Sequence, residues 1–424
     1  MSQKKFNPVF NSYLIYIGVA IASAGVALYT PLIVSETGKH FSGFWAASIL
    51  FGLNLGRVLG ALVGSRFPKL ANHPLIVSGN ILLEGVALYC MAFLGQAWAL
   101  ALFALLAGLG SGLSFPGLKN YLLKLRELDQ SSLFSRLAFA IRTGLVLGYL
   151  TASWVPHDSL QWVFLIVLIT FVAYGLFMLV AMRAITRHET AYLSVPEQQT
   201  AARSTPAHEH RPTAGTNAAS TAEPARLPAL FYLSNAMFWC FAIQPMIGFS
   251  LHIPKYTPDL PVSTPFWLAA LVIIFFQIPI SKLAIRTRDH FRFLRIAYVC
   301  LFVSFVIMLL FNHSAAAVIV SAILLSFAQV FYGPSLDVLT ARFADRVGAD
   351  TGRLMSQQML YQSMGNMVGS LAGGMLFDLA QALRWPSLNW GLLAAGSMVM
   401  LLLSRTTIPE LYRHAGRGRG QHNH

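Results

Sequence analysis

Apolar stretches of about 20 residues recur along almost the whole chain, with short polar segments between them. A helix needs about 20 apolar residues to cross the roughly 30 Å of hydrocarbon in a bilayer. The pattern therefore predicts an all-α integral membrane protein with twelve spanning helices, at residues 12–34, 44–65, 74–95, 97–122, 134–155, 161–182, 229–251, 265–285, 294–312, 315–340, 356–378 and 387–404.

The apolar pattern stops between the sixth and seventh stretches. Residues 183–228 are rich in Ala, Thr, Pro and charged side chains and keep no apolar period, which is typical of a flexible linker. The break predicts an N-terminal six-helix bundle over residues 1–182 and a C-terminal one over residues 229–405, followed by a polar tail over residues 406–424.

The composition excludes several classes of protein. Of the 424 residues, 56% are apolar and 11% are charged, whereas soluble proteins usually carry about 25% charged residues. A soluble enzyme, a disordered protein and a secreted disulfide scaffold are therefore excluded. Cys90, Cys240 and Cys300 lie in apolar stretches, so we expect neither disulfides nor a metal site. No Gly-rich phosphate loop is present, so we expect no nucleotide cofactor and no ATP-driven pump.

The net charge of +14 is explained by membrane topology. On the predicted spans, Lys39, Lys255 and Arg384 fall on one side of the membrane, and Arg57 and Arg142 fall within it. The other 25 of the 30 Lys and Arg residues lie in or beside the opposite loops and the termini. Positive residues concentrate on the cytoplasmic side, so both termini and the linker are predicted to be cytoplasmic, without a nucleic-acid partner.

The two halves contain matching residues at similar spacing. Gly144 and Gly148 in the fifth span correspond to Gly365 and Gly369 in the eleventh, at an offset of 221 residues. Two further matches have offsets of 218 and 220 residues, namely Pro116 with Pro334 and Arg66 with Arg286. The offsets predict a duplicated six-helix unit, and an even number of helices per unit gives a parallel repeat.

Small residues recur at every fourth position in two spans of the first half. The second span has Gly52, Gly56, Gly60 and Gly64, and the fourth span has Ala104, Gly108 and Gly112. Small residues at this spacing allow the backbones of two helices to approach closely within a membrane. Two interpretations fit: a fixed helix pair, or a smooth surface on which two bundles rock.

These features resemble the major facilitator superfamily over nearly the whole chain. The segment Gly60 to Lys69, with Gly64 and Arg66, looks like the family's loop between spans 2 and 3. The eleventh span is similar to the glycine motif of efflux members. The resemblance implies alternating access between two bundles and a conformational role for Gly60, Gly64, Arg66, Gly144, Gly148, Gly365, Gly369, Gly373 and Gly374.

Three charged residues are predicted to lie near the middle of the membrane. Arg57, Glu84 and Arg142 are each about 14 Å from the cytoplasmic end of their helices at 1.5 Å per residue. Glu84 and one arginine form a buried structural pair, or Glu84 carries the coupling proton. Lys119 and Asp337 lie nearer the cytoplasm, where they line a cavity or extend toward water. Asp337 is the second candidate for proton coupling.

Amide and aromatic side chains gather within the predicted spans. A cavity with aromatic walls and a few amides suits a moderately sized organic molecule, and many of these groups also suit hydrogen bonds between helices. With Arg57, Arg142 and Lys119, the candidate substrate-binding residues are Asn54, Trp239, Gln244, Gln329, Tyr332, Tyr361 and Gln362.

Together, these features predict a monomeric secondary transporter of the bacterial inner membrane, not an enzyme. The favoured function is proton-driven export, by antiport, of a drug, a siderophore or another metabolite. Near the middle of the membrane the predicted spans contain two basic groups, Arg57 and Arg142, and one acid. The substrate is therefore expected to be anionic or zwitterionic. Uptake of an anionic metabolite is the alternative function, and a receptor or scaffold without transport is a third.

Overall fold

The computed structural model describes residues 8–67, 73–125, 130–155, 160–193, 229–286, 289–347 and 351–405, and this part of the chain is helical without strands. The first half comprises α1 (Pro8–His40), α2 (Gly43–Arg66), α4 (Pro74–Cys90) with a short 3₁₀ turn (Met91–Phe93), α5 (Ala97–Leu123), α6 (Gln130–Ala152) and α7 (Leu160–Leu193). The second comprises α8 (Ala229–Ala242), α9 (Gln244–Tyr256), α10 (Thr264–Arg286), α11 (His290–Leu310), α12 (Ala315–Val347), α13 (Thr351–Ala382) and α14 (Leu388–Arg405).

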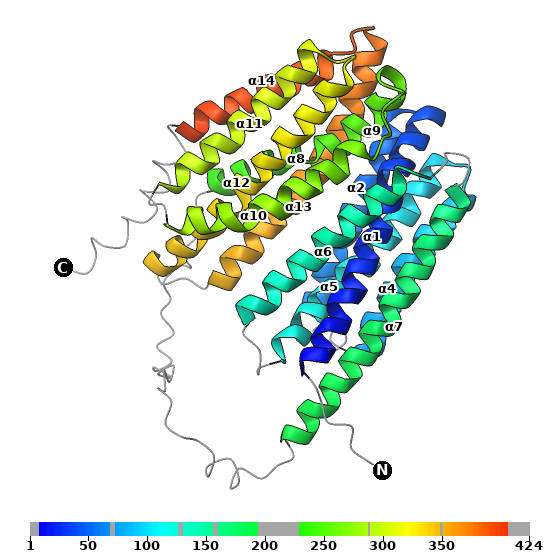
Figure 1. Ribbon diagram of the computed structural model, residues 1–424, viewed down its shortest axis with the longest axis vertical. Helices are drawn as coiled ribbons and strands as arrows, with labels where there is room; N and C mark the ends of the chain where they lie inside the picture. The colour runs from blue at the N-terminus through cyan, green and yellow to red at the C-terminus, as the bar shows by residue number, and fades with distance from the viewer. Residues whose placement is uncertain are drawn as a thin grey trace, which may run out of the picture.

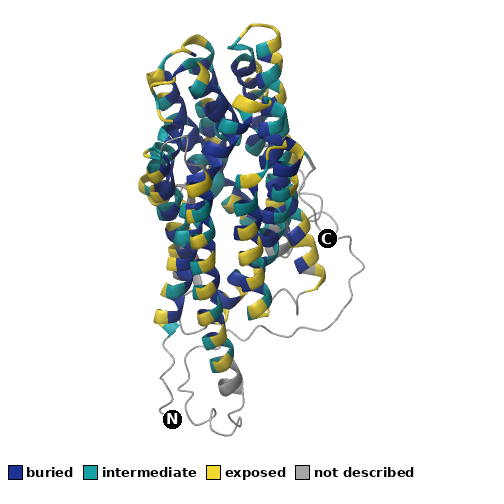
Figure 2. Ribbon diagram, turned by 90° about the vertical axis from the view of Figure 1, so that its right-hand side faces the viewer, coloured by how far each residue is buried: buried dark blue, intermediate teal, exposed yellow. Residues whose placement is uncertain are grey.

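These helices confirm the predicted all-α membrane architecture. Ten spans among the described residues are long and apolar enough to cross a membrane. Their exposed side chains include many large apolar groups, as expected of surfaces that face lipid. Figure 2 shows exposed residues along the outward sides of the helices and buried residues between them.

Each half packs its helices in the same pairs. In the first half α1 contacts α6, α2 contacts α5, and α4 contacts α7; in the second half α8 contacts α13, α10 contacts α12, and α11 contacts α14. The halves meet where α2 contacts α13 and where α6 contacts α10. Exchanging the halves maps one of these contacts onto the other, so the arrangement confirms two parallel six-helix bundles (Figure 1).

The matched glycines allow the same close helix contact in both halves. A β-carbon at Gly144 or Gly148 of α6 would strike the carbonyl oxygen of Ala20 or Ala24 of α1. One at Gly365 or Gly369 of α13 would strike the backbone of Ala236 or Cys240 of α8. Glycine is therefore required at the same helix contact of each half, which explains the 221-residue spacing.

The glycine stripe of α2 lies inside the first half. A β-carbon at Gly56 would strike the carbonyl oxygen of Leu105 on α5, and one at Gly60 would lie 2.6 Å from that of Leu109. From the opposite side, a β-carbon at Gly108 of α5 would strike Leu53 of α2. The stripe is thus a fixed helix pair, and the alternative of a rocking surface between bundles is wrong for these glycines.

Two elements differ from the sequence-based prediction. Helix α7 continues to Leu193, into the segment assigned to the linker, because hydropathy marks where the membrane ends and not where a helix ends. The rest of that linker, residues 194–228, and the predicted tail lie outside the described residues. The seventh span is interrupted at Ile243, where α8 gives way to α9 with Pro245 in its first turn.

The halves touch at one end of the molecule. We call this the far end, since the first and last described residues, Pro8 and Arg405, lie at the opposite, terminal end. Contacts at the far end include Gly43 of α2 with Gly374 of α13, and Ser153 after α6 with Ser263 before α10. Toward the terminal end the ribbons of the two halves diverge (Figure 1).

Candidate functional site

Glu84 lies deep inside the first half, on α4. It is 5% exposed, and the side chain of Ser111 on α5 lies beside its carboxylate. Helices α4 and α5 approach closely here because a β-carbon at Gly110 would lie 2.5 Å from the carbonyl oxygen of Asn80 and 3.0 Å from the amide nitrogen of Glu84. This close approach places the hydroxyl of Ser111 near the carboxylate of Glu84.

Arg57 of α2 lies within electrostatic range of Glu84. Its backbone packs against Gly112 of α5, and its charge also reaches Tyr29 of α1. We call Glu84, Arg57, Ser111 and Tyr29 the Glu84 cluster. Since four different helices supply one residue each, any relative movement of these helices changes the field at the carboxylate.

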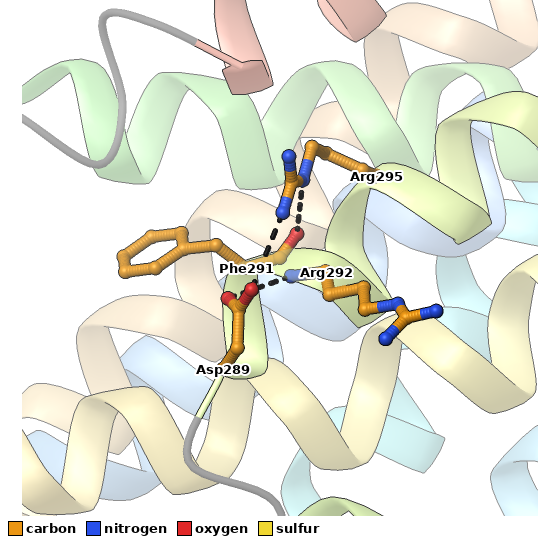
Figure 3. Close-up of polar contacts among 4 residues, drawn as sticks. All are labelled: Asp289, Phe291, Arg292 and Arg295. Atoms are coloured by element: carbon orange, nitrogen blue, oxygen red, sulfur yellow. Dashed lines mark hydrogen bonds and ion pairs between the residues drawn. The ribbon is translucent and has the colours of Figure 1, made fainter.

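Arg57 and Glu84 do not form a direct ion pair. In the described part of the chain, ion pairs join Glu36 to Lys39 and His40, and Asp289 to Arg295. Figure 3 shows the latter at the start of α11, where Asp289 also accepts a hydrogen bond from the amide of Arg292. The predicted structural pair of Glu84 with an arginine is therefore absent from this conformation.

Arg142 of α6 extends the Glu84 cluster toward the second half. It lies within electrostatic range of Tyr149, about two turns further along the same helix, and Tyr149 in turn is within range of Tyr29. The ring of Tyr149 packs at 5.5 Å from that of Phe266 on α10. The three predicted deep charges thus share one region of the first half that reaches the interface.

Lys119 and Asp337 occupy corresponding places in the two halves. The offset of 218 that relates Pro116 to Pro334 also relates these two residues. The ammonium of Lys119 lies 4.8 Å from the ring centre of Phe115. Asp337 is exposed and accepts a hydrogen bond of 2.7 Å from Gln358 of α13. They carry opposite charges on α5 and α12, toward the terminal end.

Several predicted substrate-binding residues serve the packing of helices. The side-chain amide of Gln244 donates to the carbonyl oxygens of Cys240 and Gly369, at 2.8 and 2.9 Å, and so ties the interruption between α8 and α9 to α13. Tyr332 is 1% exposed, with its ring stacked 3.5 Å from that of Phe238.

Other candidates are more accessible. Asn54 donates to the carbonyl oxygen of Leu50 on its own helix, at 2.9 Å. Tyr361 is half-buried and stacks on Tyr232 at 4.9 Å. Three further candidates are half-buried in the second half, namely Trp239, Gln329 and Gln362. The accessible amide and aromatic groups therefore come mainly from the second half, opposite the charges of the first.

A cavity of about 480 Å³ lies between the halves at the far end, away from the Glu84 cluster. Both halves contribute to its walls, which include Ser35, Lys39, Ser42, Lys255, Phe377, Asp378 and Gln381. Among the described residues, no group of three or more His, Cys, Asp or Glu side chains has the arrangement of a metal site.

Sequence reasoning missed three groups around the predicted charges. Ser111, Tyr29 and Tyr149 sit in apolar stretches, where nothing in the local pattern marks their partners. Asp378 was missed as well, although a signal existed. It lies near the C-terminal end of α13, where the helix dipole disfavours an acid, so a partner outside its own helix was to be expected.

Comparisons with known proteins agree with the fold. A sequence model described as Major Facilitator Superfamily matches residues 13–356. The multidrug resistance protein MdtH of Proteus mirabilis (strain HI4320) is 25% identical over 367 residues, which cover 84% of this chain and 85% of that protein. MdtH of Shigella dysenteriae serotype 1 (strain Sd197) is 26% identical over 359 residues, covering 82% of each chain.

Solved structures have the same fold. A POT family transporter in complex with 5-aminolevulinic acid gives a TM-score of 0.70 at 14% identity and covers 94% of this chain and 96% of its own. A mutant of the nucleoside transporter NupG gives 0.66 at 13% identity, with 93% and 99% covered. At these identities the likeness concerns the fold alone.

Proposed function

The chain belongs to the major facilitator superfamily, and on that premise we propose that it exports a small organic molecule in exchange for protons. It is a multi-pass membrane transporter, not an enzyme. The curated relatives, which match over most of their length, are named multidrug resistance proteins, and this favours export over the alternative of uptake.

The observation that carries the proton coupling is the environment of Glu84. A carboxylate buried in the membrane interior is costly unless it is protonated or paired. Glu84 has the side chain of Ser111 beside it and Arg57 nearby, without a direct ion pair. In our proposal Glu84 is protonated while Arg57 lies at a distance from it. When the halves move, Arg57 approaches Glu84, and the carboxyl group releases its proton.

The same arginines define the substrate class that we propose. Arg57, Arg142 and Lys119 outnumber Glu84 in the first half, and an arginine holds a carboxylate through two parallel hydrogen bonds. An anionic or zwitterionic molecule would neutralise this excess charge. Half-buried Trp239 and Gln362 of the second half would then contact its uncharged part.

Transport in vesicles tests the proposal. In inside-out vesicles, 5-carboxyfluorescein, rhodamine B and ethidium serve as anionic, zwitterionic and cationic probes. We expect an imposed proton gradient to drive accumulation of the first two, and a protonophore to stop it. A gradient of 100 mV supplies about 2.3 kcal/mol per charge, enough for roughly fiftyfold accumulation.

Glu84→Gln is the decisive variant, because glutamine keeps the shape and the hydrogen-bonding capacity of glutamate but cannot bind and release a proton. It should abolish gradient-driven accumulation, whereas Glu36→Gln, which removes an acid near the far end, should not. Accumulation that persists after protonophore treatment would refute proton coupling, and accumulation that persists in Glu84→Gln would refute Glu84 as the proton carrier. Accumulation only in right-side-out vesicles would establish uptake of an anionic metabolite, the second candidate function.

We further propose that the protein is a monomer in the bacterial inner membrane, with its terminal end in the cytoplasm. The asymmetry of Lys and Arg residues supports this orientation. Protease added to inside-out vesicles should cut within residues 194–228 and leave two fragments of similar size. Cutting in right-side-out vesicles alone would show that the topology is the opposite of the proposed one.

A further inference from the structure

The two halves are in close contact where α13 meets the start of α2. Gly374 of α13 packs directly against the carbonyl oxygen of Gly43, and a β-carbon there would also lie 2.5 Å from that of Ala47. One helical turn further along α13 stands Asp378. The absence of a side chain at Gly374 brings this acid to the first turn of α2.

Asp378 caps a helix of the other half. Its Oδ1 accepts a hydrogen bond of 2.7 Å from the amide of Gly43, and its Oδ2 accepts one of 2.8 Å from the amide of Phe44. The first amides of a helix have no partner within it, and the helix dipole adds positive charge at this end. Both hydrogen bonds are charge-assisted, and both join the two bundles.

The repeat contains a weaker counterpart of this contact. Offsets of 221 and 220 residues relate Gly374 to Ser153 and Gly43 to Ser263. Ser153 and Ser263 share one hydroxyl hydrogen bond of 2.7 Å, also between the halves. The far end therefore contains two related polar contacts between the halves, of which one is charged and one is neutral.

We propose that Asp378 is a gating residue, which keeps the far end closed while the terminal end is open. Opening the far end requires the carboxylate to leave the amides of Gly43 and Phe44, and no such charged bond holds Ser153 and Ser263. The resting transporter is thus open at its terminal end, where substrate can enter. That consequence for export rests on the proposed function, but the gating role does not.

Spin-label distances across the far end measure this role without any transport assay. Labels are attached to Trp154→Cys and Leu383→Cys, exposed positions of the first and second half, after replacement of Cys90, Cys240 and Cys300. In the purified full-length chain, an open far end appears as a longer distance. Failure of export in vesicles would leave this measurement intact.

Asp378→Asn should raise the ratio of open to closed molecules about tenfold, because the charge-assisted bonds are lost. Asp259→Asn, an exposed acid in the turn between α9 and α10, is the matched control and should change nothing. Equal distance distributions in the parent, Asp378→Asn and Asp259→Asn would overturn the proposal.

A second variant keeps the test decisive if Asp378→Asn does not fold. Phe44→Pro removes one of the two donated amides while keeping the acid, and the first turn of a helix tolerates proline. It should raise the open-to-closed ratio about threefold, in line with the loss of one bond. An unchanged ratio in Phe44→Pro would also contradict the role of Asp378.

Discussion

The two six-helix halves pack alike but carry different polar groups in the membrane. The repeat offset of 220 places neutral Gln277 and Ser304 at the positions of Arg57 and Glu84, and the offset of 221 places Ser363 at that of Arg142. Ser304 forms a hydrogen bond of 2.6 Å with Ser321, a contact between neighbouring helices. Duplication has thus preserved the glycine contacts of α6 and α13, whereas Arg57, Glu84 and Arg142 have no charged counterpart in the second half.

This difference fits the proposed function. In that proposal the first half holds the groups that exchange a proton and bind negative charge, and the second half supplies aromatic and amide surfaces. A site between unlike halves can bind a substrate with a charged end and an apolar body. Substitutions at matched positions of the two halves therefore test the comparison directly.

The largest difference is expected between the two candidate proton carriers. Glu84→Gln should lower proton-driven export at least about a hundredfold, since a group that transfers a proton has no substitute. Asp337→Asn should lower it less than about threefold, because Asp337 is exposed and its Gln358 partner can still pair with an amide. Equal losses would place coupling in both halves.

The glycine contacts should respond equally in the two halves. Gly148→Val and Gly369→Val each force a branched side chain into the backbone of a neighbouring helix. Each should destabilise the protein by about 3 kcal/mol, at the upper end of overpacking costs, and lower the melting temperature in detergent. Gly79→Val and Gly333→Val are the controls, because no atom lies within 4 Å of a β-carbon at either position.

The predicted spans matched the structure because membrane thickness imposes the length of apolar stretches on the sequence. The depth of Glu84 and Arg57 in the membrane stays a prediction from the same measure. The residues beside Glu84 did not follow from the sequence, since Ser111 and Tyr29 lie on other helices, and the pattern of one helix does not show which face its neighbours turn toward it. Gln244 looked like a substrate ligand because an amide gives no sign of the carbonyl groups that it will meet.

A moderate effect is expected at the proposed anion site. Arg57→Gln introduces the residue type of its counterpart, Gln277, and should weaken the apparent affinity for 5-carboxyfluorescein about tenfold through loss of a charged hydrogen bond. Gln277→Ala should change it less than about twofold, since a neutral amide contributes less. Protein abundance is measured in parallel. If Arg57→Gln is present at normal abundance and its apparent affinity for 5-carboxyfluorescein is unchanged, the proposed anion site is refuted.

The smallest effect is expected at the neutral contact of the far end. Ser263→Ala removes one hydroxyl hydrogen bond and should raise the open-to-closed ratio about twofold, well below the effect of Asp378→Asn. Spin-label distances measure both variants in the same background. A larger shift in Ser263→Ala than in Asp378→Asn would reverse the ranking of the two contacts.

The fixed pair of α2 and α5 has a mechanical consequence. Backbones joined through Gly52, Gly56 and Gly60 bend little against each other, so the pair behaves as a single stiff lever. Its far tip is the capped start of α2, and Arg57 lies ~21 Å along it at 1.5 Å per residue. A tilt released at the tip would therefore move Arg57 and Ser111 together, as parts of one rigid unit.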